Sequence, residues 1–331
     1  MIQVFNKLKS FYITFLFLLF FFNFFINYIF ADNLEKNIFS DTLIVSNYPE
    51  EIIKPGIIFS EIINKKPLRI LFYHKNKAKN NLFINLIVTN TTSRIIKIKV
   101  IKALFGPCED GIFAGHAATK KFVTDLVQGK YQEIVLLPKQ KINLFSYLIK
   151  SDQISTGLIR ILPQKKGEIK VTLLAVEDKL FNLSYFEESK DIFNYGLFYK
   201  STKKISLNFS NKTPIEEISI GDKPFLKDHD HNITLYGNYG LFYLIDVILN
   251  NKDNWYKKVD LYFSPTAGGV RGLLIINNQI IETGYFDIKD NLHPKKIFAL
   301  VLNPKSRKKI HIITIPEAGS FYPVKLVFQT K

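Results

Sequence analysis

The side chains best suited to covalent chemistry lie in the segment GPCEDGIFAGH, residues 106–116. It holds Cys108, the only cysteine of the chain, followed by Asp110 and His116. A thiol nucleophile needs an imidazole base within reach and a third group that orients the base, and the start of a helix lowers the thiol pKa. The residue types are present, but no second catalytic feature such as an oxyanion loop accompanies them. We therefore expect a loop packed over the end of a sheet, and we assign no catalytic residue.

Four residues whose side chains can bind metals follow one another at Asp228, His229, Asp230 and His231. Adjacent side chains on extended backbone point to opposite sides, so at most two of the four can reach one ion. A structural zinc site uses four ligands. The sequence therefore predicts a solvated turn here and no metal site.

The glycines of PTAGGVRG, residues 265–272, resemble a phosphate-binding loop only in composition. Such a loop needs a helix directly after it, whereas the apolar run VRGLLII follows here. This order favours a hairpin. We predict no cofactor.

An uncharged apolar run, Ser10–Ala31, follows Lys7 and Lys9 near the start of the chain. A short basic segment before such a run is typical of an export signal or an N-terminal membrane anchor. The short apolar core and the small residue at its end favour cleavage. The large Ile29 before the cut, and a length that suffices to span a bilayer, favour an uncleaved segment that stays in the membrane. In either case we expect residues 32–331 outside the cytoplasm: periplasmic, at the cell surface or membrane-anchored.

The chain is strongly basic, with a formal net charge of +16. A charge this large attracts polyanions, which outside the cytoplasm are anionic surface polymers, acidic glycans and lipid headgroups. An envelope protein is a further candidate partner. The lysines are scattered, which indicates a generally basic surface rather than one dedicated patch. An exported chain without clustered arginines or a recognition motif is not expected to bind nucleic acid.

Strand patterns dominate the sequence after residue 67. Ile96, Ile98 and Val100 alternate with Lys97 and Lys99, as in an antiparallel strand with one buried and one solvated face. Several such runs precede residue 177, and a second set follows residue 204. The sequence therefore predicts an all-β fold of two antiparallel β-sandwich domains in tandem.

One helix interrupts the first set of strands. Ala118, Phe122 and Leu126 form an apolar stripe at helical spacing, and Gly129 is a suitable stop, so we expect a helix near residues 115–128. The predicted organisation then comprises a signal or anchor at 1–31, an extended lead-in at 32–66, a sandwich at 67–177 with the inserted helix, a packed linker at 178–203 and a second sandwich at 204–331.

The two halves share an order of motifs. Ile87–Asn90 (IVTN) corresponds to Val247–Asn250 (VILN), and Leu136–Leu144 (LLPKQKINL) corresponds to Val301–Ile312 (VLNPKSRKKIHI). This order predicts a tandem repeat. The pattern resembles tandem immunoglobulin-like or fibronectin-III-like modules of exported bacterial proteins. The resemblance implies adhesion, scaffolding or glycan contact rather than chemistry.

The loops of the second set fall alternately at its two ends if its strands run antiparallel. One end then collects the loops 237–240, 264–269, 287–294 and 316–320. They hold glycines, aromatic rings and a few charges, as sugar or peptide recognition requires. Its candidate ligand-binding residues are Tyr239, Arg271, His293, Glu317 and Tyr322. The alternative is that this end packs on the first domain with its aromatic rings buried.

The sequence thus favours an exported, non-enzymatic binding or scaffolding protein of the cell envelope. Two alternatives stay open. One is an extracytoplasmic hydrolase or glycan-processing enzyme with scattered carboxylates. The other is a subunit of an envelope assembly that adds a partner strand to an exposed sheet edge.

Overall fold

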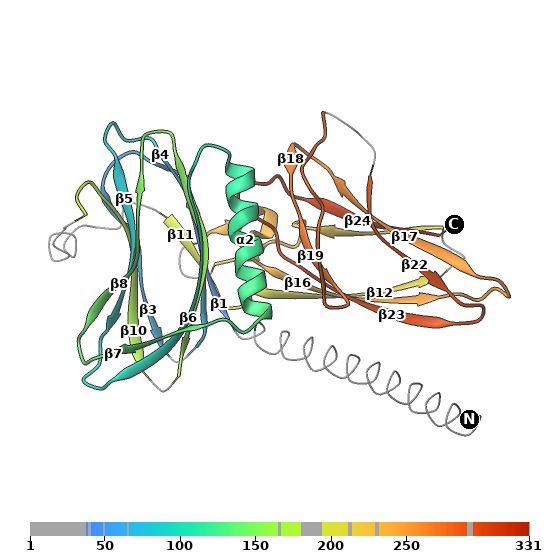
Figure 1. Ribbon diagram of the computed structural model, residues 1–331, viewed down its shortest axis with the longest axis horizontal. Helices are drawn as coiled ribbons and strands as arrows, with labels where there is room; N and C mark the ends of the chain where they lie inside the picture. The colour runs from blue at the N-terminus through green and yellow to red at the C-terminus, as the bar shows by residue number, and fades with distance from the viewer. Residues whose placement is uncertain are drawn as a thin grey trace, which may run out of the picture.

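The computed structural model describes residues 38, 41–48, 50–64, 66–164, 167–179, 194–210, 214–228, 232–289 and 294–330. In this part of the chain the fold is mostly β, with several sheets around one long helix, α2 (Gly111–Val127) (Figure 1). The predicted all-β class is confirmed at this level. The apolar run at 10–31 lies outside the described residues. None of the helices in the described part is long and apolar enough to cross a membrane.

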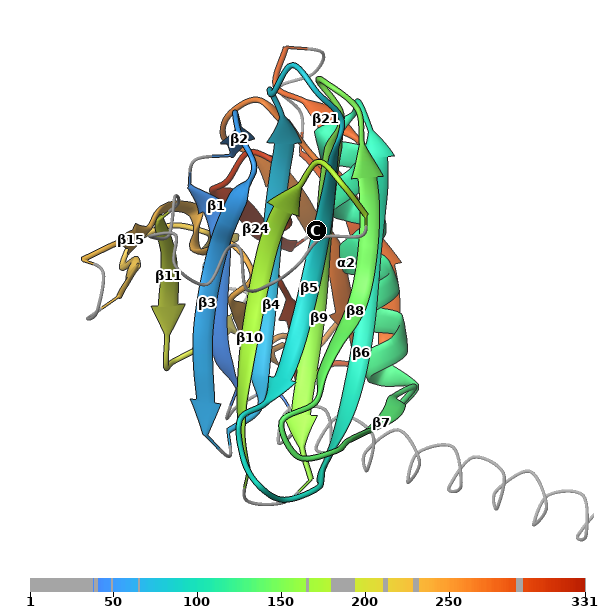
Figure 2. The same ribbon diagram turned by 90° about the vertical axis from the view of Figure 1, so that its left-hand side faces the viewer.

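The first sheet pair consists of a larger sheet in the order β11-β1-β4-β9-β6-β7, with β2 paired to β4, and a four-stranded sheet in the order β3-β10-β5-β8. Figure 2 looks onto the four-stranded sheet, with the larger sheet behind it. Apolar side chains from both sheets, among them Ile98, Leu86 and Leu173, form one buried core. The strands are β1 (Thr42–Tyr48), β2 (Glu51–Ile52), β3 (Gly56–Asn64), β4 (Leu68–Asn76), β5 (Leu82–Asn90), β6 (Ile96–Cys108), β7 (Gln132–Leu136), β8 (Lys141–Ile149), β9 (Ile154–Pro163), β10 (Glu168–Val176) and β11 (Asn194–Phe198).

The second sheet pair consists of a sheet in the order β12-β16-β23-β19-β20 and a sheet in the order β13-β24-β17-β22. Its own core includes Tyr243, Leu261 and Phe328. Two short ribbons, β14-β15 and β18-β21, lie outside these sheets. The elements are β12 (Thr202–Ser210), β13 (Ile215–Ile220), β14 (Leu226–Lys227), β15 (Thr234–Leu235), η1 (Tyr236–Asn238), β16 (Phe242–Asn250), β17 (Lys257–Pro265), β18 (Gly269–Val270), β19 (Leu273–Ile276), β20 (Gln279–Glu282), β21 (Phe286–Asp287), β22 (Lys295–Leu302), β23 (Arg307–Thr314) and β24 (Val324–Thr330).

A third core, the junction core, joins the two sheet pairs. It contains Leu71 from β4, Phe122 from α2 and Leu244 from β16, so the outer faces of β4 and β16 meet with α2 beside them (Figure 1). A sheet buried on both faces needs apolar side chains at every position, which hides the alternation typical of a one-sided strand. The strands β4 and β16 at this junction are therefore mostly apolar on both faces, as in the runs Ile70–Tyr73 and Phe242–Ile245.

A buried charge network lies within the junction. Asp41 accepts hydrogen bonds from Arg160 at 2.9 Å (Nη2) and 3.0 Å (Nε), and its Oδ2 lies 3.4 Å from Nη1 of Arg69. All three side chains are at most 1% exposed. Arg69 also donates to the carbonyl oxygen of Ser201, and its guanidinium lies 4.5 Å from the ring centroid of Phe242. Burial lowers the pKa of Arg69 to about 10, opposed by the charge of Asp41. The network connects β4 and β9 to the second sheet pair.

Two expected boundaries are corrected by the structure. The extended lead-in at 32–66 supplies β1, β2 and β3. The packed linker at 178–203 contains β11, which pairs with β1, and the first two residues of β12. Strand β1 escaped detection because Leu43 faces the junction core while Ile44 faces the core of the first sheet pair, which removes any polar alternation.

The helix begins before the expected residue 115. Its first residue is Gly111, because the carboxylate of Asp110 accepts a hydrogen bond from the backbone N–H of Phe113 and caps the first turn. Of the DHDH segment, Asp228 is described, and its carboxylate accepts a hydrogen bond from the backbone N–H of Leu197. The other three residues of that segment lie outside the described part.

Three asparagines close strand connections in the same way. The side-chain amide of Asn90 donates to the carbonyls of Arg94, Leu136 and Leu137, and that of Asn251 donates to the carbonyls of Trp255, Leu302 and Asn303. Asn76 repeats the pattern with the carbonyls of Asn80 and Ile149. Each side-chain oxygen in turn accepts the backbone N–H two residues further on. We call each of these an asparagine hub.

Candidate ligand-binding site at the junction

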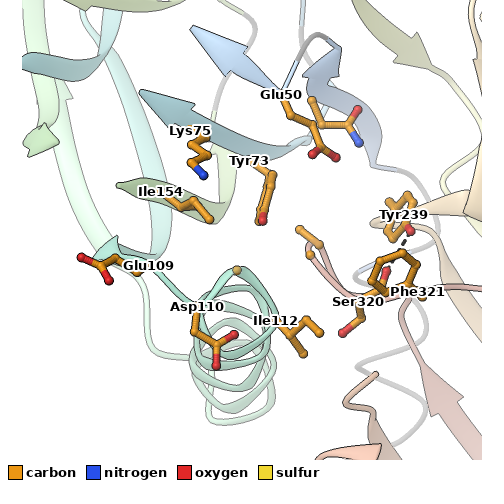
Figure 3. Close-up of a pocket in the computed structure, with 14 residues that line it drawn as sticks. Glu50, Tyr73, Lys75, Glu109, Asp110, Ile112, Ile154, Tyr239, Ser320 and Phe321 are labelled. Carbon is orange, nitrogen blue, oxygen red and sulfur yellow. Dashed lines mark hydrogen bonds between the residues drawn. The ribbon is translucent and has the colours of Figure 1, made fainter. Parts of the chain in front are cut away.

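A cavity of about 550 Å³ opens where the two sheet pairs meet the start of α2. Figure 3 shows Tyr73 and Lys75 on one side, Tyr239 and Phe321 on the opposite side, and the first turn of α2 between them. The first sheet pair and α2 contribute nine lining residues and the second sheet pair contributes the other five. The lining residues are Asn47, Glu50, Tyr73, Lys75, Glu109, Asp110, Gly111, Ile112, Ile154, Tyr239, Ala318, Gly319, Ser320 and Phe321.

Strand β4 positions the first side of this cavity. Residues two apart on a strand point to the same face, and in β4 the residues on the junction face are Arg69, Leu71, Tyr73 and Lys75. Arg69 belongs to the charge network, Leu71 to the junction core, and the last two line the cavity. One face of β4 thus contributes residues along the whole junction, from the buried charge network to the open cavity.

Backbone hydrogen bonds gather the loops on the opposite side. The N–H of Gly240 donates to the carbonyl of Pro316 at 3.0 Å, and the N–H of Phe321 donates to the carbonyl of Gly269 at 3.0 Å. The loops 237–240, 264–269 and 316–320, expected at one end of the second set of strands, therefore lie together. Of these, the loops 237–240 and 316–320 face the first sheet pair across the cavity.

Two of the predicted site residues are tyrosines in this loop cluster. Tyr239 lines the cavity, and its hydroxyl donates to the carbonyl of Ser320 at 2.8 Å. Its ring meets that of Tyr322 edge to face, with centroids 5.8 Å apart. Burial raises the pKa of both hydroxyls, so both are neutral donors at physiological pH.

Arg271 and Glu317, also predicted, lie behind the cavity wall. The Arg271 guanidinium lies 5.6 Å from the ring centroid of Phe113 in α2 and 5.9 Å from that of Tyr285. Glu317 is fully buried and precedes the lining residues 318–321. Neither residue lines the cavity, and both contribute to packing against α2. The fifth predicted residue, His293, lies outside the described part of the chain.

Glu317 belongs to a cluster centred on His116 of α2, in which Glu317 and His116 are buried and Glu282 and Lys120 are exposed. His116 Nδ1 lies 2.9 Å from Glu317 Oε2, and Nε2 lies 3.1 Å from Glu282 Oε2. Lys120 Nζ lies 2.7 Å from the other oxygen of Glu282. Burial lowers the pKa of His116, but hydrogen bonds and charges from the two glutamates outweigh it and raise the pKa overall. Burial also raises the pKa of Glu317, whereas Lys120 lowers that of Glu282.

These shifts predict a junction that weakens as the pH rises. The raised pKa of His116 stabilises the fold fully below its ordinary value of 6.5, and this stabilisation is lost as the pH rises through the folded pKa. The raised pKa of Glu317 acts in the same direction, and the lowered pKa of Glu282 removes stability only in acid below 4.5. We expect the Tm to be highest near pH 4.5, because Glu282 removes stability below this pH and Glu317 removes it above. The Tm should fall further above pH 6.5, as His116 loses its proton. Scanning calorimetry across pH should show a flatter alkaline limb in His116→Gln, and identical slopes in both proteins would contradict the prediction.

The geometry does not unite Cys108, Asp110 and His116 into a catalytic group. Both ring nitrogens of His116 face glutamate carboxylates, the Cys108 thiol donates to the carbonyl of Asp110 at 3.4 Å, and the Asp110 carboxylate caps α2. The segment is not the expected loop: residues 106–108 are the end of β6 and residues 111–116 begin α2, with only residues 109–110 between them.

The cavity carries mixed chemistry. Glu50, Glu109 and Asp110 provide three carboxylates and Lys75 one ammonium, on a chain that is basic as a whole. Burial, with the neighbouring Glu51, raises the pKa of Glu50. Rings with carboxylates and hydroxyls beside them can stack on a sugar and hydrogen-bond its hydroxyl groups.

The chain matches no protein-family model and no curated protein. Its structural neighbours are distant. Lac15 from a marine microbial metagenome has 11% sequence identity and a TM-score of 0.12, with 83% of this chain and 59% of that chain covered, so the chain spans less than two thirds of Lac15. The PBSX exported protein XepA has 7% identity and a TM-score of 0.16, with 84% and 86% covered. The CBM22-1-CBM22-2 tandem domain of Paenibacillus barcinonensis Xyn10C has 11% identity and a TM-score of 0.15, with 78% and 72% covered. TM-scores this low define neither the fold nor the function of this chain.

Proposed function

We propose that this protein is an exported, non-enzymatic binding protein of the cell envelope that holds a glycan in the junction cavity. The observation that carries the proposal is the cavity itself, which is lined from both sheet pairs by rings, carboxylates and hydroxyls. The junction core beneath it fixes the two walls relative to each other. A pre-formed site of this kind loses little conformational entropy when it binds.

The structural contacts that already occupy the reactive side chains support binding over catalysis. His116 is held between two glutamates and Asp110 caps a helix, so each already serves the fold. A general base must be free to reach a substrate proton. The cavity walls instead offer flat rings and oxygen acceptors.

The module architecture belongs to the same proposal: two immunoglobulin-like sandwiches in tandem, descended from one unit. The strand order β4-β9-β6-β7 corresponds to β13-β24-β17-β22. The hubs at Asn90 and Asn251 bond equivalent carbonyls, and Lys139 and Lys305 both have a positive φ at the equivalent point of the opposite turn. The equivalence places Asn90 against Asn251, one residue beyond the pairing with Asn250 that the sequence suggested.

Two cavity variants test the binding role. Glu50→Gln removes a carboxylate charge, and Phe321→Ala removes a ring that is 54% exposed. We expect each to weaken the binding of soluble cell-wall glycan fragments at least about fivefold, the effect of losing one charged hydrogen bond or one stacked ring. Isothermal titration calorimetry measures the Kd. Leu148→Ala serves as control, because Leu148 is an exposed apolar residue of β8 on the far sheet of the first pair. Equal affinity in the wild type and both cavity variants would refute the site.

Export is the second part of the proposal, supported by Lys7 and Lys9 before the uncharged run that ends at Ala31. We expect mass spectrometry of the protein from its native envelope to find an N-terminus near Asp32 or an intact membrane-bound chain. Recovery of the full chain from the soluble cytoplasm would contradict export.

A further inference from the structure

The end of the second sheet pair that contains the β16–β17 and β22–β23 turns lies away from α2 (Figure 1). Two aromatic residues of this end are exposed to solvent. This distal tip consists of the β16–β17 turn, residues 251–256, the β22–β23 turn, residues 303–306, and the first residues of β17 and β23. Trp255 and Tyr256 are 60% and 68% exposed. We propose that the distal tip docks on an anionic membrane surface, a role separate from ligand binding in the cavity.

The fold does not require aromatic residues at these positions. The side-chain amide of Asn251 donates to the backbone carbonyl of Trp255. This hydrogen bond does not depend on which side chain residue 255 carries. In the hub of Asn90 the corresponding residues are Arg94 and Ile95, and in the hub of Asn76 they are Asn80 and Asn81. The equivalent connections therefore close without a tryptophan or tyrosine, which leaves the rings of the distal tip without a structural reason to be exposed.

The two turns of the tip are held together. The backbone N–H of Lys305 donates to the carbonyl of Asp253, its Nζ donates to the carbonyl of Lys252, and the N–H of Asn251 donates to the carbonyl of Ser306. The two rings are therefore attached to a turn that these hydrogen bonds hold in place. A side chain presented in this way loses little conformational freedom when it enters an interface.

The charge of the tip matches an anionic surface. Lys257 lies over the ring of Trp255, with Nζ 5.6 Å from the centroid, and Asp253 pairs with Lys257 at 3.4 Å. The other basic residues of the tip are all exposed. They are Lys252, Lys258, Lys305, Arg307 and Lys308. Tryptophan and tyrosine favour the headgroup region of a bilayer, and each Lys or Arg near an anionic leaflet adds about 1 kcal/mol of attraction. A soluble polyanion would be bound by the positive charges alone. The combination of exposed rings and surrounding lysines therefore favours a lipid surface.

Trp255 is the only tryptophan of the chain, so it reports on the tip alone. The full chain is mixed with vesicles of phosphatidylcholine, or of phosphatidylcholine with phosphatidylglycerol, and the tryptophan emission is recorded. Residues 1–31 hold no tryptophan, so any insertion of their apolar run is silent in this signal. We expect emission to move to shorter wavelength, and to be quenched by brominated lipid, only with the anionic vesicles.

Matched variants separate the tip from the general basic surface. Lys258→Gln should weaken the anionic-vesicle affinity about fivefold, the value of one lysine near the surface. Its counterpart in the hub of Asn90, Lys97→Gln, should leave it unchanged. Tyr256→Ser should weaken binding and Ile95→Ser should not. The proposal is overturned if Trp255 emission does not respond, if it responds equally to zwitterionic vesicles, or if dextran sulfate gives the same shift and brominated lipid gives no quenching.

Discussion

Asp41→Ala is expected to lower the free energy of unfolding by about 3–5 kcal/mol, because it leaves buried arginines without their counterion. Arg69 and Arg160 both bond this carboxylate, and neither side chain is more than 1% exposed. Urea denaturation measures the loss directly. Most of this loss in stability should appear as separation of the two sheet pairs, because the network lies in the junction.

A surface pair provides the control for this variant. Glu217→Ala removes the exposed ion pair with Lys325 on the second sheet pair, and exposed pairs contribute at most about 1 kcal/mol. Equal losses from Asp41→Ala and Glu217→Ala would show that the buried network does not hold the junction.

Gly115→Ala is the second change with a large expected effect. A Cβ at residue 115 would overlap the backbone carbonyl of Ala318, and backbone cannot move aside as a flexible side chain can. We expect a loss of about 3 kcal/mol or more from overpacking. The C-terminal end of α2 offers a comparison at Gly129, where nothing lies within 4 Å but φ is +62°. Gly129→Ala should cost only about 1–2 kcal/mol, the strain of a left-handed alanine. A Tm loss for Gly115→Ala no greater than that for Gly129→Ala would contradict the close packing of α2 on residues 316–320.

The strand content and the helix could be predicted from the sequence because both follow local patterns. Ile96, Ile98 and Val100 are buried as the alternation predicts, and Ala118, Phe122 and Leu126 face the junction side of α2. Strands β1 and β3 were missed because consecutive residues in both are buried, which leaves no alternation of apolar and polar residues. Local patterns do not contain the information that two sheets meet face to face.

Part of the cavity wall from the second sheet pair could be predicted, whereas the wall from the first sheet pair and α2 could not. Tyr239 was found because its loop combines glycines and rings, whereas Glu50, Tyr73 and Lys75 lie far from it in the sequence. A signal existed, since Tyr73 and Lys75 are two apart at the end of one strand and share a face. Its meaning depends on the packing of α2 and the second sheet pair, which no single strand specifies. Arg271 and Glu317 were placed at the correct end, but they face α2 rather than the cavity.

Hydrogen-exchange mass spectrometry of the full chain with soluble cell-wall glycan fragments tests the central claim most directly. A ligand in the junction cavity should slow exchange together in three places, at Asn47 and Glu50, in 109–112 and in 318–321, which line it from both sheet pairs. The distal tip at 251–256 should exchange as it does without ligand. Protection confined to one sheet pair, or absent from all three places while binding is saturated, would contradict the account.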